Sequence, residues 1–169
     1  QVWDAATGKA LVTLAGHEQT VISAQFSADG MRIVTASEDS TARVWDAVTG
    51  KTLAALAGHK RQVRSARFSA EGTRIVTASF DGTARVWDAA TGGVLATLAG
   101  HKGSLQSAQF SPDGTRIVTA GRGDKTARIW EAGTGIMLRT LAGHEDEVHS
   151  AQFSPDGVPF HTAQFSPDG

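Results

Sequence analysis

Short apolar segments alternate with polar turns along the whole chain. Within residues 59–100, the segments 63–68, 73–79, 83–87 and 93–98 are rich in apolar and β-branched side chains. The stretches between them supply Asp, Gly and Ser, which favour hairpin turns and positive φ angles. No window is long enough, and periodic enough at about 3.6 residues, to predict a helix. The pattern therefore predicts four short antiparallel strands per unit and an all-β chain.

The unit recurs with a nearly fixed period. Gly-His pairs begin at residues 16, 58, 100 and 143, so successive copies lie 42, 42 and 43 residues apart. Residues 17–58 and 59–100 are identical at 29 of 42 positions. One four-stranded sheet buries too little surface to be stable alone, whereas sheets stacked around an axis cover one another. The repeat therefore predicts a single domain over residues 1–169, built from stacked sheets.

The recurring motifs Gly-His, FSPDG and TASFDGTARVWD occur in a constant order. They resemble the WD-repeat family of β-propellers, most closely its highly repetitive bacterial arrays, and the resemblance covers the whole chain. It implies blades of four antiparallel strands, about four blade equivalents, with repeats at about 17–58, 59–100 and 101–143.

The resemblance also implies one hydrogen-bonded set in each blade. Its members are the His of Gly-His, a Ser or Thr late in the second strand, the Asp of the next turn and the Trp of the third strand. Partly buried polar groups of this kind lower the free energy only when they are paired with one another. The matching residues are His17, Ser37, Asp39 and Trp45; His59, Ser79, Asp81 and Trp87; and His101, Asp124 and Trp130, where Gly121 replaces the Ser and one residue is inserted.

The last blade is expected to be shared between residues 144–169 and residues 1–16. Its first strand falls at 148–153, and a near-copy of that strand at 158–163 takes the place of the missing second strand. The beginning of the chain then supplies the third and fourth strands. The predicted set of this blade is His144, Asp168 and Trp3, with Gln164 in place of the Ser.

Closure of the ring can occur within one chain or between two. Four blades closing alone require about 90° per blade, whereas eight blades from two chains require about 45°, nearer to the usual propeller geometry. A two-fold homodimer forming one eight-bladed ring is therefore expected. It would also cover the unpaired sheet edges that an incomplete ring exposes. The alternative is a piece of a longer WD-repeat array, such as that of a larger bacterial signalling protein.

Composition argues against several classes of function. The 16 Lys and Arg and the 17 Asp and Glu give a net charge of −1, so no overall charge attracts nucleic acid or an anionic membrane. The absence of Cys excludes disulfides and thiolate metal sites and fits a reducing compartment, with the cytoplasm as the default. No apolar run reaches the ~20 residues of a membrane span. We expect no cofactor.

Three chemical readings of the motifs compete with a structural one. Ser, His and Asp suggest a hydrolase, but catalysis needs an exposed nucleophile and an oxyanion site, and repetition of the set beside Trp favours a structural role. The tripeptide Arg122-Gly123-Asp124 suggests cell adhesion, but Asp124 already has a structural assignment. His149 and His161 lack the spacing of a metal site. We therefore expect a chain that is not an enzyme.

Partner-binding residues are expected where the near-identical repeats differ, in the loop after each Gly-His and at one strand position. These positions should lie on one rim, alternate between acidic and basic sectors, and bind a protein or peptide. They are Glu18, Gln19, Thr20 and Ile22; Lys60, Arg61, Gln62 and Arg64; Lys102, Ser104 and Gln106; and Glu145, Asp146, Glu147 and His149. The alternatives are solvated loops without a partner and a self-assembling structural module.

Overall fold

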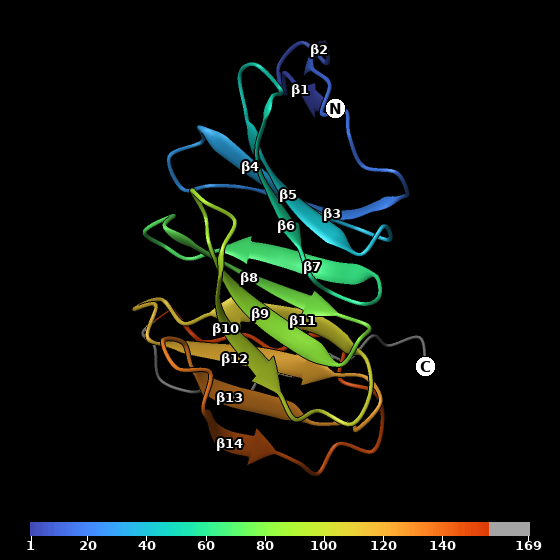
Figure 1. Ribbon diagram of the computed structural model, residues 1–169, viewed down its shortest axis with the longest axis vertical. Helices are drawn as coiled ribbons and strands as arrows, with labels where there is room; N and C mark the ends of the chain where they lie inside the picture. The colour runs from blue at the N-terminus through green and yellow to red at the C-terminus, as the bar shows by residue number, and fades with distance from the viewer. Residues whose placement is uncertain (156–169) are drawn as a thin grey trace.

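Antiparallel strands make up the regular structure of residues 1–155, the part of the chain that the computed structural model describes (Figure 1). This part contains fourteen strands and no helix. Twelve of them form three four-stranded sheets in which neighbours in sequence are neighbours in space. The three blades are β3 (Val21–Phe26), β4 (Arg32–Ser37), β5 (Thr41–Asp46) and β6 (Thr52–Ala57); β7 (Val63–Phe68), β8 (Arg74–Ser79), β9 (Thr83–Asp88) and β10 (Val94–Ala99); and β11 (Leu105–Phe110), β12 (Arg116–Gly121), β13 (Ala127–Glu131) and β14 (Met137–Leu141).

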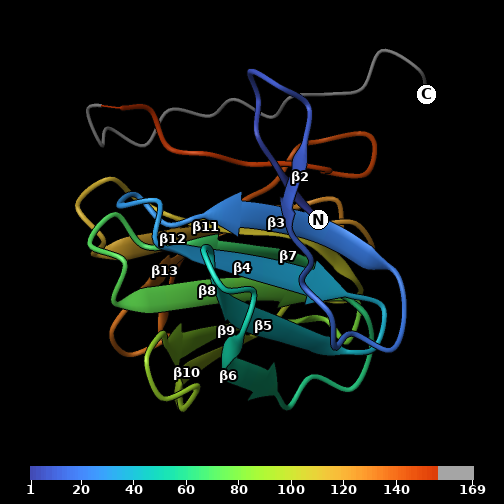
Figure 2. The ribbon, with the colours of Figure 1, turned by 90° about the horizontal axis from the view of Figure 1, so that it is seen from above.

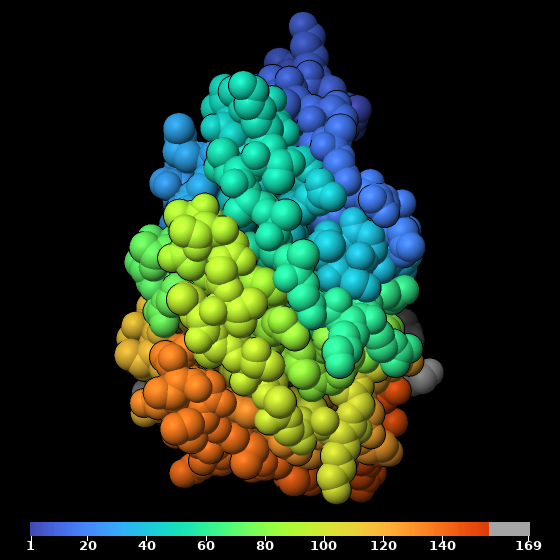
Figure 3. Space-filling view, viewed as in Figure 1, coloured from blue at the N-terminus to red at the C-terminus, as the bar shows by residue number. Residues whose placement is uncertain are grey.

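The blades stack face to face, and apolar side chains fill the space between them. Val44 and Leu56 of the first blade pack in one core with Phe68, Ile75 and Trp87 of the second. The equivalent residues of the second and third blades form a second core of the same kind. The space-filling view shows the blades following one another along the long axis (Figure 3). The predicted repeat is thus also the unit of packing.

The first strands of the blades lie next to one another along the stack. β3 contacts β7, and β7 contacts β11 (Figure 2). Polar bonds reinforce this inner contact, because Phe68 N donates to Gln25 Oε1 at 3.0 Å and Ala108 N donates to Ser65 Oγ at 3.2 Å. Each blade therefore fixes the position of the next at its inner edge as well as through its apolar face.

A two-stranded sheet precedes the first blade, formed by β1 (Val2–Trp3) and β2 (Ala10–Val12). It supplies only the outer half of a blade, and within the described residues β1 pairs with β2 alone. The described residues supply no inner half for this blade. Trp3 is therefore 57% exposed and Phe26 is 50% exposed, whereas the equivalent Trp87 and Phe68 are 1% and 8% exposed. One face of the first blade is therefore open.

Residues 148–153 do not form the strand that the sequence predicts. Val148 and Phe153 nevertheless pack on the third blade with Val118 and Ala120, in the places that Val63 and Phe68 take on the first. Burial of these side chains positions the segment, but a strand also needs a hydrogen-bonded neighbour. The predicted second strand at 158–163, Gln164 and Asp168 lie outside the described residues. Figure 1 shows β1 and β2 at the opposite end of the stack from β14, so the described residues do not join the two ends within one chain.

Candidate functional site

A chain of four hydrogen-bonded side chains crosses each complete blade. In the second blade, His59 Nδ1 lies 2.8 Å from Asp81 Oδ2, and His59 Nε2 lies 2.8 Å from Thr77 Oγ1. The indole Nε1 of Trp87 donates to the same hydroxyl at 2.9 Å. A neutral imidazole satisfies this arrangement, because Nδ1–H donates to the carboxylate while Nε2 accepts from the threonine. The set connects a turn at the rim to the buried Trp in the centre of the blade.

The hydroxyl in this chain belongs to a threonine, which corrects the sequence prediction of Ser37 and Ser79. Ser79 Oγ instead donates to Arg61 O at 3.0 Å and accepts from Asp81 N at 3.0 Å, so it holds the turn that presents Asp81. Ser37 bonds in the same way to Gln19 O and Asp39 N. A sequence signal was present, because the Thr two residues earlier occurs in all three complete repeats, whereas the third has Gly121 in place of Ser.

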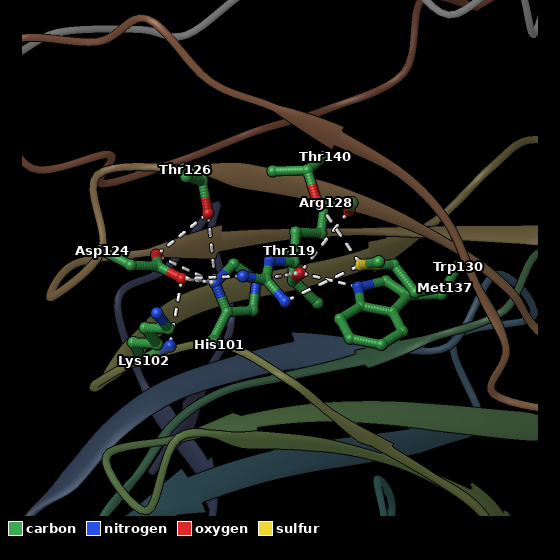
Figure 4. Close-up of polar contacts among 9 residues, drawn as sticks. All are labelled: His101, Lys102, Thr119, Asp124, Thr126, Arg128, Trp130, Met137 and Thr140. Carbon is green, nitrogen blue, oxygen red and sulfur yellow. Dashed lines mark hydrogen bonds and ion pairs between the residues drawn. The ribbon is translucent and has the colours of Figure 1, made fainter.

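The first and third blades repeat the arrangement. His17 lies 2.7 Å from Asp39 Oδ2 and 2.7 Å from Thr35 Oγ1, which also accepts from Trp45 Nε1 at 2.8 Å. In the third blade, His101 lies 3.0 Å from both oxygens of Asp124 and 2.8 Å from Thr119 Oγ1, and Trp130 Nε1 lies 2.8 Å from the same hydroxyl (Figure 4). The predicted fourth set is not assembled among the described residues, since Trp3 is exposed at the far end of the stack.

In the three complete blades, the Gly of the Gly-His pair makes room for an arginine that lies beside the Trp. The guanidinium of Arg85 lies 5.9 Å from the ring centre of Trp87, and a Cβ built on Gly58 would come within 2.6 Å of Arg85 Nη1. Gly58 also has a φ of 153°, and Gly16 and Gly100 repeat both features. A larger residue would displace the arginine, which explains why Gly precedes the His in these three blades.

Burial and hydrogen bonding shift the pKa values of the set. Burial lowers the pKa of His59 and His101, because it disfavours the imidazolium more than Asp81 and Asp124 stabilise it. Burial alone would raise the pKa of Asp81, but hydrogen bonds from Thr83, Lys60 N and His59 lower it to about 2. The folded protein therefore holds neutral histidines beside ionised aspartates.

Stability is expected to decrease as the pH falls. The folded pKa of His59 and His101 lies below the unfolded value of 6.5, so their contribution is present above that pH and is lost below it as the unfolded chain takes up protons. Asp81 adds a second loss as the pH falls below its unfolded value of 3.8 towards about 2. Urea unfolding across this pH range measures both losses, and a protein that became more stable between neutral pH and pH ~5 would contradict the assignment.

The third blade cannot accept the serine that the repeat pattern suggests. A Cβ built on Gly121 would collide with Asp124 Oδ1 and with His101 Nδ1. Gly121→Ser is therefore expected to destabilise the protein by about 1–3 kcal/mol, because it overpacks a site where Asp124 now sits. Thermal unfolding of this variant tests the expectation, with the exposed Gly133→Ser as the control, since nothing lies near a Cβ at Gly133. A stabilised Gly121→Ser would contradict it.

The set has no group free to act as a base or a nucleophile. Both ring nitrogens of His59 are engaged, and Thr77 is fully buried between the imidazole and the indole. Among residues 1–155, no three His, Cys, Asp or Glu side chains lie close enough together to hold a metal ion. The same residues include no helix with the length and apolar character needed to cross a membrane. The chemistry of the set is therefore that of a structural brace.

The predicted rim residues occupy loops and strand ends beside this brace. The exposed ones are Glu18, Gln19, Thr20, Lys60, Arg61, Lys102, Glu145, Asp146 and His149, and the half-buried ones are Ile22, Gln62, Arg64, Ser104, Gln106 and Glu147. Two acidic positions contact the third blade, because Arg122 Nε lies 2.6 Å from Glu147 Oε2 and Lys125 Nζ donates to Glu145 O at 2.6 Å. These contacts hold residues 145–147 against the turn that follows β12.

Stacked four-stranded blades, each braced by an Asp–His–Thr–Trp chain, define a propeller-like repeat protein. The family model described as "WD domain, G-beta repeat" matches residues 8–46, 50–88, 92–131 and 135–169. The chain belongs to the WD40 repeat family.

Comparison with solved structures gives a consistent result. The chain is similar to the computationally designed Ika8 protein, with 34% sequence identity and a TM-score of 0.79 over 90% of this chain and 46% of that chain. It thus spans about half the length of that designed protein. No curated protein sequence matches the chain.

Proposed function

We propose that the chain is a non-catalytic scaffold that binds a protein or peptide on the rim formed by the loops after each Gly-His. WD40 repeats in general form protein-interaction scaffolds. The observation that carries the proposal is that these loops vary in sequence while their backbones are held by the same bonds. Glu18 N, Lys60 N and Lys102 N each donate to the Asp of their own blade, at 3.1, 3.0 and 3.1 Å.

This arrangement separates recognition from folding. The brace fixes where each loop lies, and most of the loop side chains are exposed, so they can change without disturbing the blade. Exposed residues on a rigid scaffold are the usual carriers of binding function. Glu18 in the first loop, Lys60 and Arg61 in the second and the acidic residues at 145–147 give this rim sectors of opposite charge.

Charge reversal in the second loop tests the proposal. Lys60→Glu combined with Arg61→Glu is expected to reduce capture of a rim-binding partner roughly tenfold, because rim charges govern the attraction between partners. Capture from cell extract by immobilised protein, quantified against wild type, provides the measurement. The thermal midpoint should not change, since both side chains are exposed. Equal capture by both proteins, or no partner for either, would contradict the proposal.

We further propose that two copies combine into one eight-bladed ring, with the last blade shared between them. The open face of the first blade supports this, because Val21, Phe26 and Trp3 are exposed where their equivalents in the next blades are buried. The residues from 148 to 153, packed on the third blade, extend the stack at its other end. In a longer array, the preceding repeat would cover the same face.

A further inference from the structure

The second blade presents an aromatic residue on the rim where the other blades present a charged one. Phe80 follows β8, and the equivalent residues are Glu38 after β4 and Arg122 after β12. The guanidinium of Arg64 lies over the ring of Phe80, 5.0 Å from its centre. Arg64 Nε also donates to Gln106 Oε1 of the third blade at 3.2 Å, so the stacked pair is anchored to the neighbouring blade.

Backbone and side-chain bonds hold this pair and the variable loop as one surface. Phe80 N donates to Gln62 O at 3.0 Å, and Ser79 Oγ donates to Arg61 O at 3.0 Å. Lys60 N donates to Asp81 Oδ2 at 3.0 Å. Each loop residue from 60 to 62 is therefore bonded to a different residue of the turn that carries Phe80. A surface fixed in this way loses little conformational entropy when it binds a ligand.

The surface carries several cationic side chains that form no ion pair among the described residues. Lys60, Arg61 and Lys102 are exposed. Lys102 belongs to the third blade, but its loop lies close to the turn of the second blade. A Cβ built on Gly82 in that turn would lie 3.0 Å from Gly103 O. Within residues 1–155, no carboxylate forms an ion pair with these three side chains or with Arg64. The Asp81 carboxylate forms its hydrogen bonds with His59, Lys60 N and Thr83 rather than with these cationic groups.

We infer that Phe80, Arg64, Lys60, Arg61 and Lys102 form a docking surface for an acidic peptide that carries an apolar side chain. This inference rests on the proposed function and names the class of partner. Aromatic residues and arginine are the residue types that most often dominate binding energy at protein interfaces. The apolar side chain packs against the half-buried Phe80, and the carboxylates of the peptide bind the surrounding cations.

Charge distribution favours a peptide over a nucleic acid. A nucleic acid strand needs a basic track along its phosphate backbone. Here the basic sector ends at acidic residues on both sides, with Glu18 and Glu38 on the first blade and Glu145 to Glu147 after the third. The chain as a whole has a net charge of −1. A short acidic segment fits the sector, whereas a long polyanion meets repulsion at both edges.

Fluorescence anisotropy with defined peptides tests the inference. The probe is a short labelled peptide of glutamates interrupted by leucines. In the first control peptide, glutamine replaces every glutamate. In the second control peptide, serine replaces every leucine. The probe peptide should bind more tightly than either control and should dissociate as salt is added. Phe80→Ala and Arg64→Ala should each weaken binding roughly tenfold. The matched variants Glu38→Ala and Ile22→Ala alter the equivalent positions of the first blade and should leave binding unchanged.

Four results would overturn the inference. The first two are equal binding of the three peptides and equal effects of Phe80→Ala and Glu38→Ala. The third is retained binding by the double variant Lys60→Glu and Arg61→Glu. The fourth is tighter binding of a single-stranded oligonucleotide than of the acidic peptide. If Phe80→Ala lowers the thermal midpoint, its loss of binding could come from unfolding. The test then rests on Arg61→Glu, which changes an exposed side chain and should weaken binding of the peptide. A protein partner lost on charge reversal, without peptide binding, would reject this inference and leave the proposed function standing.

Discussion

Thr77→Val is expected to lower the free energy of unfolding by about 2–4 kcal/mol, although it replaces only a hydroxyl with a methyl group. Thr77 is fully buried, and its hydroxyl is the shared partner of His59 Nε2 and Trp87 Nε1. The substitution leaves both nitrogens in the interior without a partner. Each unsatisfied buried group costs about 1–3 kcal/mol, and valine has nearly the volume of threonine, so the loss does not arise from a cavity.

Ser79→Ala is the matched control for this prediction. It removes a hydroxyl two residues away that bonds only to backbone groups, Arg61 O and Asp81 N. Its expected cost is about 1 kcal/mol, the net value of an ordinary hydrogen bond. Urea unfolding of wild type and both variants at neutral pH provides the comparison. If Ser79→Ala lowers the free energy of unfolding more than Thr77→Val does, the serine rather than the threonine is the hydroxyl of the hydrogen-bonded set, which would contradict the assignment made from the structure.

Phe26→Asp is expected to convert the proposed dimer into a monomer. Phe26 is 50% exposed on the open face of the first blade, and none of the described residues supplies a blade for it to pack against. In a two-chain ring, a charge placed there would be buried against the partner at a cost of several kcal/mol. Light scattering measures the mass in solution, and the variant should fold because the substituted side chain faces solvent in the monomer.

Two further variants make this result interpretable. Val48→Asp changes a residue that is 72% exposed in the turn between β5 and β6, and it should leave the mass unchanged. Phe68→Asp changes the equivalent of Phe26 in the second blade, which is 8% exposed, and it should unfold the chain rather than dissociate it. A wild-type protein that is monomeric, or a Phe26→Asp variant that stays dimeric, would contradict the proposed ring.

The sequence predicted the strands of the complete blades well, because repetition reinforced each local signal. Turn residues at the same offsets in each repeat marked the hairpins, and β3, β7 and β11 all begin and end at equivalent residues. The last blade was less predictable. A strand was expected at 148–153, but Val148 and Phe153 pack on the third blade in a segment that pairs with no strand among the described residues.

The site was predicted in part. His59, Asp81 and Trp87 were placed in one bonded set, and the structure brings them together through Thr77. The serine was assigned in its place because both hydroxyls lie late in the same strand, and sequence alone does not say which one the imidazole reaches. Phe80 was missed altogether. It lies outside the loop that was compared between repeats, and its contact with Arg64 depends on how the turn folds back over β7.

The near-identical cores between successive blades have a consequence for how such a chain changes in length. Val44 and Leu56 meet Phe68 and Trp87 in one interface, and the next interface uses the residues one period further along. A gene segment encoding one blade can therefore be inserted or deleted, and the new neighbours will fit without compensating substitutions. Each event should change the stability of the stack by a nearly constant increment, so recombination can alter the size of this protein more safely than point mutation can alter its interior.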